Sequence, residues 1–468
     1  MTQLVWFRND LRTGDNPALT AACKENQPVR ACFVVTPGQW QIHDWSPARI
    51  RFVIDHANAL AKLLARLGIP LDFLEAGDFR ETNRILADYC RDHQVQAVHI
   101  NEEYAVNERR RDKEMAARLT QNGIVLHSYR DQCIAPVGSV LTQQNEPYSV
   151  FTPFSRRWHS WVAETGPSPW PAPAPVAAPV RANRYDKPLP GLEQAPPALV
   201  DTGEAAAHHR LAAFVDEQAG NYKDQRDLPG QPGTSLLSPY LANGVLSGTQ
   251  CLVAAQQAQG AASNQQGLST WVNELAWRDF YIHILYHYPR VSMHRAFKPE
   301  TEHLVWNAPG DVFDAWRAGQ TGIPLVDAGM RQLNATGWMH NRVRMVTAMF
   351  LTKNLFIDWR LGEQYFMSRL VDGFLASNNG GWQWSASTGT DAAPYFRVFN
   401  PVTQSERFDP QGDYIRQWVP ELAGLDNKRI HDPGRGGTLP KGYPRAIVDL
   451  KESRKEAIAR FQGLKDRG

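Results

Sequence analysis

Cysteine is scarce in this chain of 468 residues, which contains only five. They are widely scattered and include no CxxC pair, which excludes a disulfide scaffold and a cysteine-based zinc site. We therefore expect a reducing compartment and no bound metal. The five are Cys23, Cys32, Cys90, Cys133 and Cys251.

Long apolar runs and a strong net charge are also absent. No run approaches the length of a membrane span, and the N-terminal MTQLVWFRNDLR lacks the parts of a signal peptide. We therefore expect a cytoplasmic protein that does not bind membranes. Because the formal net charge is only +2, contact with nucleic acid requires a local basic patch.

The N-terminal part lacks a GxGxxG fingerprint, so a dinucleotide held in the Rossmann manner is not expected there. Five apolar runs alternate with amphipathic stretches, which predicts a doubly wound parallel sheet with any ligand at the carboxyl ends of its strands. Ser46 and Pro47 predict the start of one helix, and Gly68 predicts its end. The expected strands cover 4–7, 31–35, 71–74, 97–100 and 124–127, and a further helix covers 107–119.

Proline and helical periodicity divide the rest of the chain. The segment 166–179 reads GPSPWPAPAPVAAP, and proline at this density predicts an extended connector. Residues 204–378 show mostly helical patterns, and loops with one helix over 453–464 follow. We therefore expect an α/β domain over 1–132, an interdomain connector over 133–203 and an all-α domain over 204–468.

Tryptophan is abundant: of 15 in the chain, nine lie after residue 270. Bulky helix packing is one explanation, and an aromatic cofactor site or an electron-transfer chain is the other. Trp271, Glu274, Trp277 and Arg278 share one helical face. This face indicates either an amphipathic boundary helix with a salt bridge or a functional site, because burying unpaired charge in a core is costly.

Three further segments combine polar groups with aromatic, glycine or thioether residues. Asn341, Arg344 and Met345 share a helical face that suits a polar heterocycle, or else a core Met beside surface arginines. The segment 372–384 contains the adjacent pair Gly380 and Gly381, which we expect to form a turn or to approach a ligand closely. Hydroxyls over 234–238 either cap a helix or contact a phosphate.

Five segments resemble the photolyase/cryptochrome family, and the resemblance extends over roughly residues 2–420. They are WFRNDLRTGDNPAL, WVNELAWRDFY, TGIPLVDAGMRQLNATGWMHNRVRM, DWRLGEQYF and NNGGWQWSASTGTDAAPYFRVFNP. The resemblance implies a doubly wound α/β antenna domain, a Pro-rich connector and an all-α domain that binds FAD.

The resemblance also assigns cofactor contacts position by position. Asn378 is expected to face flavin N5 and to help set which redox forms are stable. The expected FAD-binding residues are Tyr222, Thr234, Ser235, Leu236, Ser238, Trp271, Arg278, Trp338, Arg344, Asp372 and Asn378. An indole relay that passes electrons from the surface to the flavin is expected at Trp306, Trp359 and Trp382.

The activity that the resemblance implies is light-dependent repair of cyclobutane pyrimidine dimers in DNA. An electron passes from excited, fully reduced FAD to the flipped-out dimer and then returns, so the enzyme is a carbon–carbon lyase. The expected dimer pocket comprises Glu274, Trp277, Asn341, Met345 and Trp384, and the expected DNA phosphate contacts are Arg226, Arg342 and Arg397.

Members that repair the (6-4) photoproduct have histidines at the positions of Asn341 and Met345, so this chain favours the cyclobutane dimer. The alternatives are a cryptochrome-like blue-light photoreceptor without repair activity and a flavin-dependent oxidoreductase. We expect a monomer in the bacterial cytosol or nucleoid, without an obligate protein partner.

A folate antenna, 5,10-methenyltetrahydrofolate, is also implied. His43, Asn107 and Glu108 match the positions that hold it in folate-using members. Met293 stands where a Lys is found in close bacterial relatives, which weakens the expected binding.

One departure from the family concerns the flavin itself. The family pattern Asp-x-Asp reads Asp372-Gly-Phe374 here, and a phenyl ring cannot accept a hydrogen bond. A buried flavin N–H would then lack a partner, at a cost of about 1–3 kcal/mol.

We therefore predict that Phe374→Asp increases the FAD retained per protein or shifts the flavin potential. Absorbance of the purified protein and a redox titration measure the two quantities. Identical values of both in the variant and the parent chain would contradict the prediction.

Overall fold

The computed structural model describes residues 2–25, 27–259, 265–435 and 437–465. The chain forms two compact units. The first comprises Met1–Gly220, Ser235–Pro289 and Val371–Phe374, and the second comprises Asn221–Thr234, Arg290–Leu370 and Leu375–Gly468. These contacts group several helices after residue 203 with the α/β part. The expected domains, which are drawn from sequence patterns, stay a prediction.

The first unit is built on a five-stranded sheet with the order β3-β2-β1-β4-β5, and every strand pair is parallel. The expected α/β fold and all five strands are confirmed. The strands are β1 (Thr2–Phe7), β2 (Val29–Val35), β3 (Leu71–Glu75), β4 (Val95–Asn101) and β5 (Val125–Tyr129).

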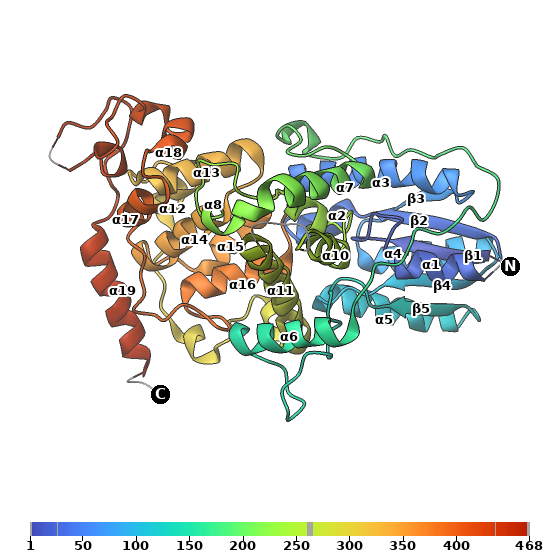
Figure 1. Ribbon diagram of the computed structural model, residues 1–468. Coiled ribbons are helices and arrows are strands. Elements are labelled where there is room, and N and C mark those ends of the chain that lie inside the picture. Colours follow the sequence, from blue (N-terminus) through green and yellow to red (C-terminus); the bar gives the residue numbers. More distant parts are fainter. Residues whose placement is uncertain (1, 26, 260–264, 436, 466–468) are drawn as a thin grey trace. The chain divides into compact units, whose positions relative to one another are not determined.

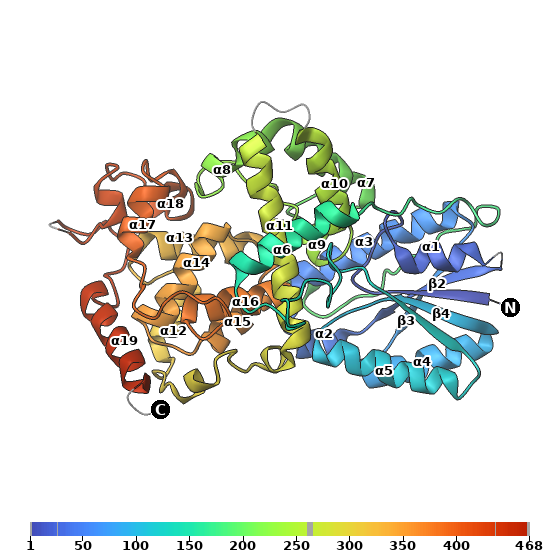
Figure 2. The ribbon, with the colours of Figure 1, turned by 60° about the horizontal axis from the view of Figure 1, so that its bottom comes forward.

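Helices cover both faces of this sheet, as Figure 2 shows. The helices α1 (Pro17–Lys24) and α3 (Pro47–Arg66) lie on one face, and α4 (Phe79–Asp92) and α5 (Val106–Thr120) lie on the other. Leu4 and Trp6 pack with apolar residues of α4 and α5, while the alternating Val5 is equally buried. Burial on both faces explains why the strands are apolar throughout.

Local signals in the sequence set the limits of α3. The Ser46 hydroxyl accepts a hydrogen bond from the Arg49 N–H at 3.0 Å, and Pro47 occupies the first turn. Gly68 follows the helix with φ +80°, and a Cβ there would lie 2.6 Å from the Ala177 carbonyl oxygen. The expected start and end of this helix are confirmed.

The proline-rich connector is extended, and its backbone bonds to the C-terminal end of α3. The N–H groups of Val176 and Val180 donate to the carbonyls of Leu67 and Ala65, both at 2.9 Å. A helix, α6 (Phe151–Thr165), precedes this stretch. The connector therefore belongs to the first unit rather than hanging free.

Four further helices belong to the first unit: α7 (Glu204–Ala213), α9 (Ser238–Ala242), α10 (Gly248–Gln259) and α11 (Gln265–His287). The loop after β1 ties them to the sheet. Arg12 is buried and donates to the Gly244 carbonyl at 3.1 Å and to Asp131. Glu204 accepts from the backbone N–H groups of Thr13 and Gly14, each at 2.8 Å.

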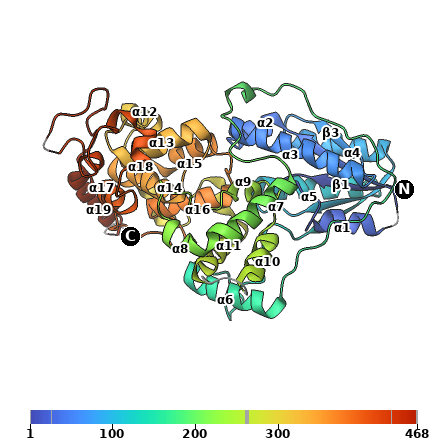
Figure 3. The same ribbon diagram turned by 45° about the horizontal axis from the view of Figure 1, so that its top comes forward.

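The second unit is helical, and Figures 1 and 3 show its elements. A large apolar cluster lies inside it and includes Trp316, Trp359 and Trp382 together with residues of the C-terminal part. The helices are α8 (Tyr222–Gln225), α12 (Gly310–Ala318), α13 (Pro324–Thr336), α14 (Asn341–Met349), α15 (Trp359–Met367), α16 (Leu375–Ala386), α17 (Pro401–Phe408), α18 (Asp413–Trp418) and α19 (Leu450–Lys465). In the described part of the chain, no helix is long and apolar enough to cross a bilayer.

The segment with Gly380 and Gly381 is helical, so of the two expected roles the turn was wrong, and a close approach to a ligand stays a prediction. Both glycines lie inside α16. Ala376, Asn379 and Gln383 are buried on one face of this helix. Burial of that face outweighs the low helix propensity of the two glycines, each of which costs about 1 kcal/mol relative to Ala.

A glycine also sets how closely α15 and α16 pack. A Cβ at Gly362 in α15 would lie 2.1 Å from the Cη2 atom of Trp382 and 2.7 Å from the Cδ2 atom of Leu351. Trp382 is only 2% exposed, so it has little room to move. The absence of a side chain at residue 362 therefore determines the position of this indole.

We predict that Gly362→Ala destabilises the protein by about 1–3 kcal/mol, as overpacking of a core does. The matched control is Gly463→Ala in α19, where a Cβ would meet no atom within 4 Å and Ala gains about 0.5–1 kcal/mol. Chemical unfolding monitored by tryptophan fluorescence measures both. A Gly362→Ala variant as stable as the control variant would contradict the prediction.

Candidate functional site

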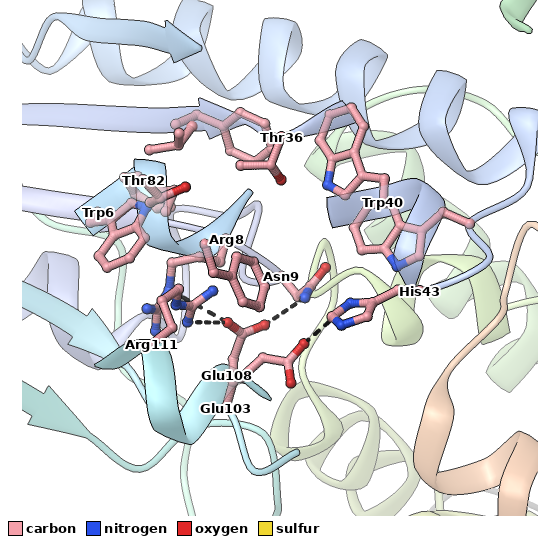
Figure 4. A pocket seen from close by; sticks show the side chains of 15 residues that line it. Trp6, Arg8, Asn9, Thr36, Trp40, His43, Thr82, Glu103, Glu108 and Arg111 are labelled. Atoms are coloured by element: carbon pink, nitrogen blue, oxygen red, sulfur yellow. Dashed lines mark hydrogen bonds and ion pairs between the residues drawn. The ribbon is translucent and has the colours of Figure 1, made fainter. Parts of the chain in front are cut away.

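A cavity of about 50 Å³ opens in the first unit at the carboxyl ends of β1, β2 and β4 (Figure 4). The strand order reverses between β1 and β4, and doubly wound sheets bind ligands at such a point. The cavity therefore lies where the sequence predicts a ligand. Its aromatic walls are Trp6, Phe7, Phe33, Trp40, Trp45 and Phe79.

Paired charges line one side of the cavity. Arg111 donates to Glu103 at 2.7 Å, and the Arg8 Nε lies 3.9 Å from the same carboxylate. Both guanidinium groups lie 4.8 Å from the centre of the Trp6 ring. Burial opposes ionisation of Glu103, but Arg111 and Arg8 outweigh it and lower its pKa to about 2. Glu103 is therefore a fixed negative charge.

The structure brings the three expected antenna residues together beside this cavity. Amide nitrogens of Gln39 and Asn107 lie 2.9 and 3.1 Å from His43 Nε2, which makes Nε2 the acceptor. Nδ1 of the same ring lies 3.6 Å from Glu108 Oε1. Burial, followed by the charge of Glu103, raises the pKa of Glu108 to about 7. Glu108 can thus accept or hold a proton near neutral pH.

Six of the expected FAD residues lie in the first unit, and two of them bond to each other. The Ser238 hydroxyl donates to the Asp372 carboxylate at 2.6 Å. Ser238 is the first residue of α9 and caps nothing with its side chain, so of the two interpretations helix capping does not apply to it. The six are Ser235, Leu236, Ser238, Trp271, Arg278 and Asp372.

Arg278 and Phe374 lie near each other in this unit. The guanidinium of Arg278 is 5.2 Å from the centre of the Phe374 ring. It also donates to the carbonyls of Gln132 and Leu241, the latter at 3.2 Å. Backbone carbonyls and a ring face hold this cation in place, and no side-chain carboxylate contributes among these contacts.

Trp277, expected in the dimer pocket, is held by another ring. It stacks on Phe151 with ring centres 3.5 Å apart and an angle of 8° between the planes. Glu274 lies one turn earlier on α11, and both side chains are half-buried. Sequence reasoning did not identify Phe151, because its helix lies in the stretch read as connector.

The second unit contains the remaining expected FAD residues: Tyr222, Thr234, Trp338, Arg344 and Asn378. The Asn378 amide nitrogen donates to the Glu363 carbonyl at 3.0 Å, which leaves the amide oxygen and the second amide N–H for a ligand. The Glu363 carboxylate accepts from Asn379 at 2.9 Å. Glu363 was missed, although a buried Glu in an apolar helix is itself a signal.

The expected relay tryptophans all pack in or against the apolar cluster of the second unit. Trp382 and Trp359 are 2% and 1% exposed, whereas Trp306 is half-buried. Trp306 is therefore the most exposed of the three, as the surface end of such a route requires.

The residues expected around DNA and the dimer differ in their exposure and in their contacts with other residues. Arg342 forms an ion pair with Asp227 at 2.9 Å. Asn341 and Arg397 are exposed. Arg344 donates to the Met339 carbonyl at 2.8 Å. Met345 and Trp384 are half-buried.

Within the described residues, no group of His, Cys, Asp and Glu is arranged to hold a metal ion.

Comparison with known proteins gives full-length matches. Residues 3–175 match the family model "DNA photolyase", and 271–463 match "FAD binding domain of DNA photolyase". The chain is 45% identical to the deoxyribodipyrimidine photo-lyase of Escherichia coli and 44% identical to that of Salmonella typhimurium, each over 99% of both chains.

Two solved photolyase structures are similar to this chain over nearly its whole length. A bacterial class III photolyase from Agrobacterium tumefaciens has a TM-score of 0.86 at 34% identity, over 99% of this chain and 98% of that one. An archaeal photolyase from Sulfolobus tokodaii, described with two FAD molecules, has a TM-score of 0.85 at 31% identity, over 99% and 100%.

The two glutamates beside the cavity predict opposite pH dependences of stability. The folded-state pKa of Glu108 lies above its ordinary 4.5, so its contribution is present at low pH and is lost as pH rises from about 4.5 to about 7. Glu103, with a pKa of about 2, contributes above 4.5 and loses its contribution below it.

We therefore expect the stability of the parent chain relative to Glu108→Gln to fall between pH 4.5 and pH 7. The stability of the parent chain relative to Glu103→Gln should instead fall only as the pH decreases below about 4.5. Thermal unfolding at several pH values measures both differences. Curves for the parent chain and Glu108→Gln that run parallel over this range would contradict the assignment.

Proposed function

This chain belongs to the DNA photolyase family, and from that premise we propose that it uses light to split cyclobutane pyrimidine dimers in DNA, as a deoxyribodipyrimidine photo-lyase. The observation that carries the proposal is the full-length match with enzymes of that name at 41–45% identity. Chemistry suited to the reaction is present at the positions that the resemblance assigns.

The side chains fit FAD by their chemistry. Ser238 and Asp372 offer a hydroxyl and a carboxylate in contact with each other, which suits hydroxyl and N–H groups of a ligand. Arg278 offers a fixed cation, and Asn378 offers an amide oxygen. The chemistry that FAD supplies when bound is one light-driven electron, lent to the dimer and returned after its two ring bonds have opened.

The protein's own part is to bind, orient and support the dimer. We assign Glu274 to hydrogen bonding of the thymine polar edges and to support of the transient dimer anion. Trp277, fixed by its stack on Phe151, covers an apolar side, and Trp384 covers another. Asn341 and Met345 complete the assigned pocket.

We assign reloading of electrons to Trp382, Trp359 and Trp306, on the basis of the resemblance and of the greater exposure of Trp306. Arg226, Arg342 and Arg397 are assigned to phosphates around the lesion; because Arg342 is paired with Asp227, its contact with DNA requires exchange of that ion pair. These arginines position the DNA, and the pocket reads the lesion.

We further propose a folate antenna at His43, Asn107 and Glu108. Their mutual contacts and the adjacent aromatic cavity support it, because Glu108 can accept from the N–H groups of a pterin ring. We also propose that the protein acts as a cytosolic monomer, and that 1–132, 133–203 and 204–468 serve as antenna domain, connector and catalytic domain.

The test is repair of UV-irradiated oligothymidine by the reduced protein. We expect thymine absorbance to return under blue light and not in the dark. Glu274→Gln should slow the return at least about tenfold, because a hydrogen bond to a charged group contributes about 1.5–3 kcal/mol. The control is Glu114→Gln, at an exposed position of α5.

Failure has two distinct forms. No recovery with FAD bound would contradict repair and favour the photoreceptor alternative. No recovery with little FAD bound would point to Phe374 as the defect, and Phe374→Asp should then restore both.

A further inference from the structure

We infer that Trp382 delivers its electron vacancy to a second exit, through Trp316 to Tyr365, in addition to the route assigned to Trp359 and Trp306. The inference rests on the proposed function, since it concerns reloading of bound, oxidised FAD. It adds two redox residues, Trp316 and Tyr365, both in the second unit.

The three rings form a continuous series. The ring centres of Trp382 and Trp316 are 6.0 Å apart, and those of Trp316 and Tyr365 are 5.7 Å apart. Both contacts are edge-to-face, at the separations of touching aromatic rings. No side chain intervenes, so an electron can hop twice between rings in van der Waals contact.

The surroundings of the two indoles favour movement of the vacancy away from Trp382. The Trp316 N–H donates to the Thr347 carbonyl at 3.2 Å, which stabilises positive charge on that indole. Among the described residues, the Trp382 N–H has no hydrogen-bond partner. Within the described residues, hydrogen bonding to the protein therefore supports an oxidised Trp316 and gives no such support to an oxidised Trp382.

Trp316 itself cannot readily release a proton to water. It is fully buried, and two phenyl rings flank it nearly parallel to its plane: Phe313 at 5.7 Å and 11°, and Phe366 at 6.1 Å and 10°. The vacancy stays mobile on this indole until a residue that can lose a proton fills it.

Tyr365 is such a residue. It is half-buried, and its hydroxyl donates to the Asn334 side-chain oxygen at 2.7 Å. The guanidinium groups of Arg317 and Arg369 lie 5.9 and 5.3 Å from its ring centre. Cations over a ring disfavour a positive charge on it, so oxidation of Tyr365 must be coupled to loss of the phenol proton. A neutral tyrosyl radical is the product that this site favours.

Electrons and protons balance as follows. Under light, Trp382 gives one electron to bound oxidised FAD, Trp316 gives one to Trp382, and Tyr365 gives one to Trp316 and its phenol proton to solvent. An external thiol then returns one electron and one proton to Tyr365. The net change is one electron moved from the thiol to the cofactor and one proton released to solvent, which leaves a thiyl radical and alters no bond of the protein.

The test uses the FAD-bound, oxidised protein with ring-deuterated tyrosine, illuminated with blue light and followed by electron paramagnetic resonance. We expect a tyrosyl radical whose line narrows on deuteration. Tyr365→Phe and Trp316→Phe should each reduce this signal, normalised to bound FAD, to background. Tyr365→Trp should replace it with a tryptophan radical. The control is Tyr286→Phe, because Tyr286 is also half-buried and has a guanidinium 4.6 Å from its ring centre.

Three results would overturn the inference: only tryptophan radicals in the parent chain, no radical in a parent chain that binds FAD, or a full tyrosyl signal in Tyr365→Phe. Dimer repair by the chemically reduced variants separates this inference from the proposed function, because pre-reduced protein needs no reloading. Loss of the tyrosyl signal in Tyr365→Phe together with failed repair by the parent chain would support the exit and contradict the photo-lyase.

Discussion

The close packing of α15 against the indole of Trp382 is the constraint on which the catalytic part of the second unit depends. It exists because residue 362 has no side chain. The same helix pair brings the Glu363 carbonyl to the Asn378 amide and the Glu363 carboxylate to Asn379. One helix contact therefore orients the amide assigned to the cofactor and also sets Trp382 against its aromatic neighbours.

The two units differ in the surroundings and the pKa shifts of their buried ionisable groups. In the first, Glu103 is ionised between two guanidinium groups, whereas Glu108 has a pKa of about 7 because burial and Glu103 both oppose its charge. In the second, Lys353 is fully buried and donates to Ser387 at 2.8 Å, and burial lowers its pKa well below the usual value. Each unit thus has an internal polar network of its own.

The fold was largely predictable because its signals are local. The parallel strands are apolar on both faces, and Ser46, Pro47 and Gly68 delimit α3 through their own hydrogen bond and dihedral angle. The sequence misled at α16, where Gly380 and Gly381 suggested a turn. Tertiary burial decided that case, and propensity gives no measure of it.

The family resemblance assigns the site residue by residue, and that assignment stays a prediction, but its supporting contacts could not be read from the sequence. Phe151 stacks on Trp277 from a helix far away in sequence, and Trp316 meets Trp382 across the core. Neither pairing has a periodicity or a motif, because each depends on how helices pack. Sequence reveals which residues can do chemistry, and only the fold shows which of them are in contact.

Cyclic use of a single electron is the central claim of this account, and counting turnovers tests it most directly. The protein would be reduced once, freed of reductant under anaerobic conditions, and given excess dimer-containing oligothymidine under blue light. The account predicts many dimers split per protein, with the flavin still reduced at the end. One dimer split per protein, with matching oxidation of the flavin, would contradict it and indicate an ordinary flavin oxidoreductase.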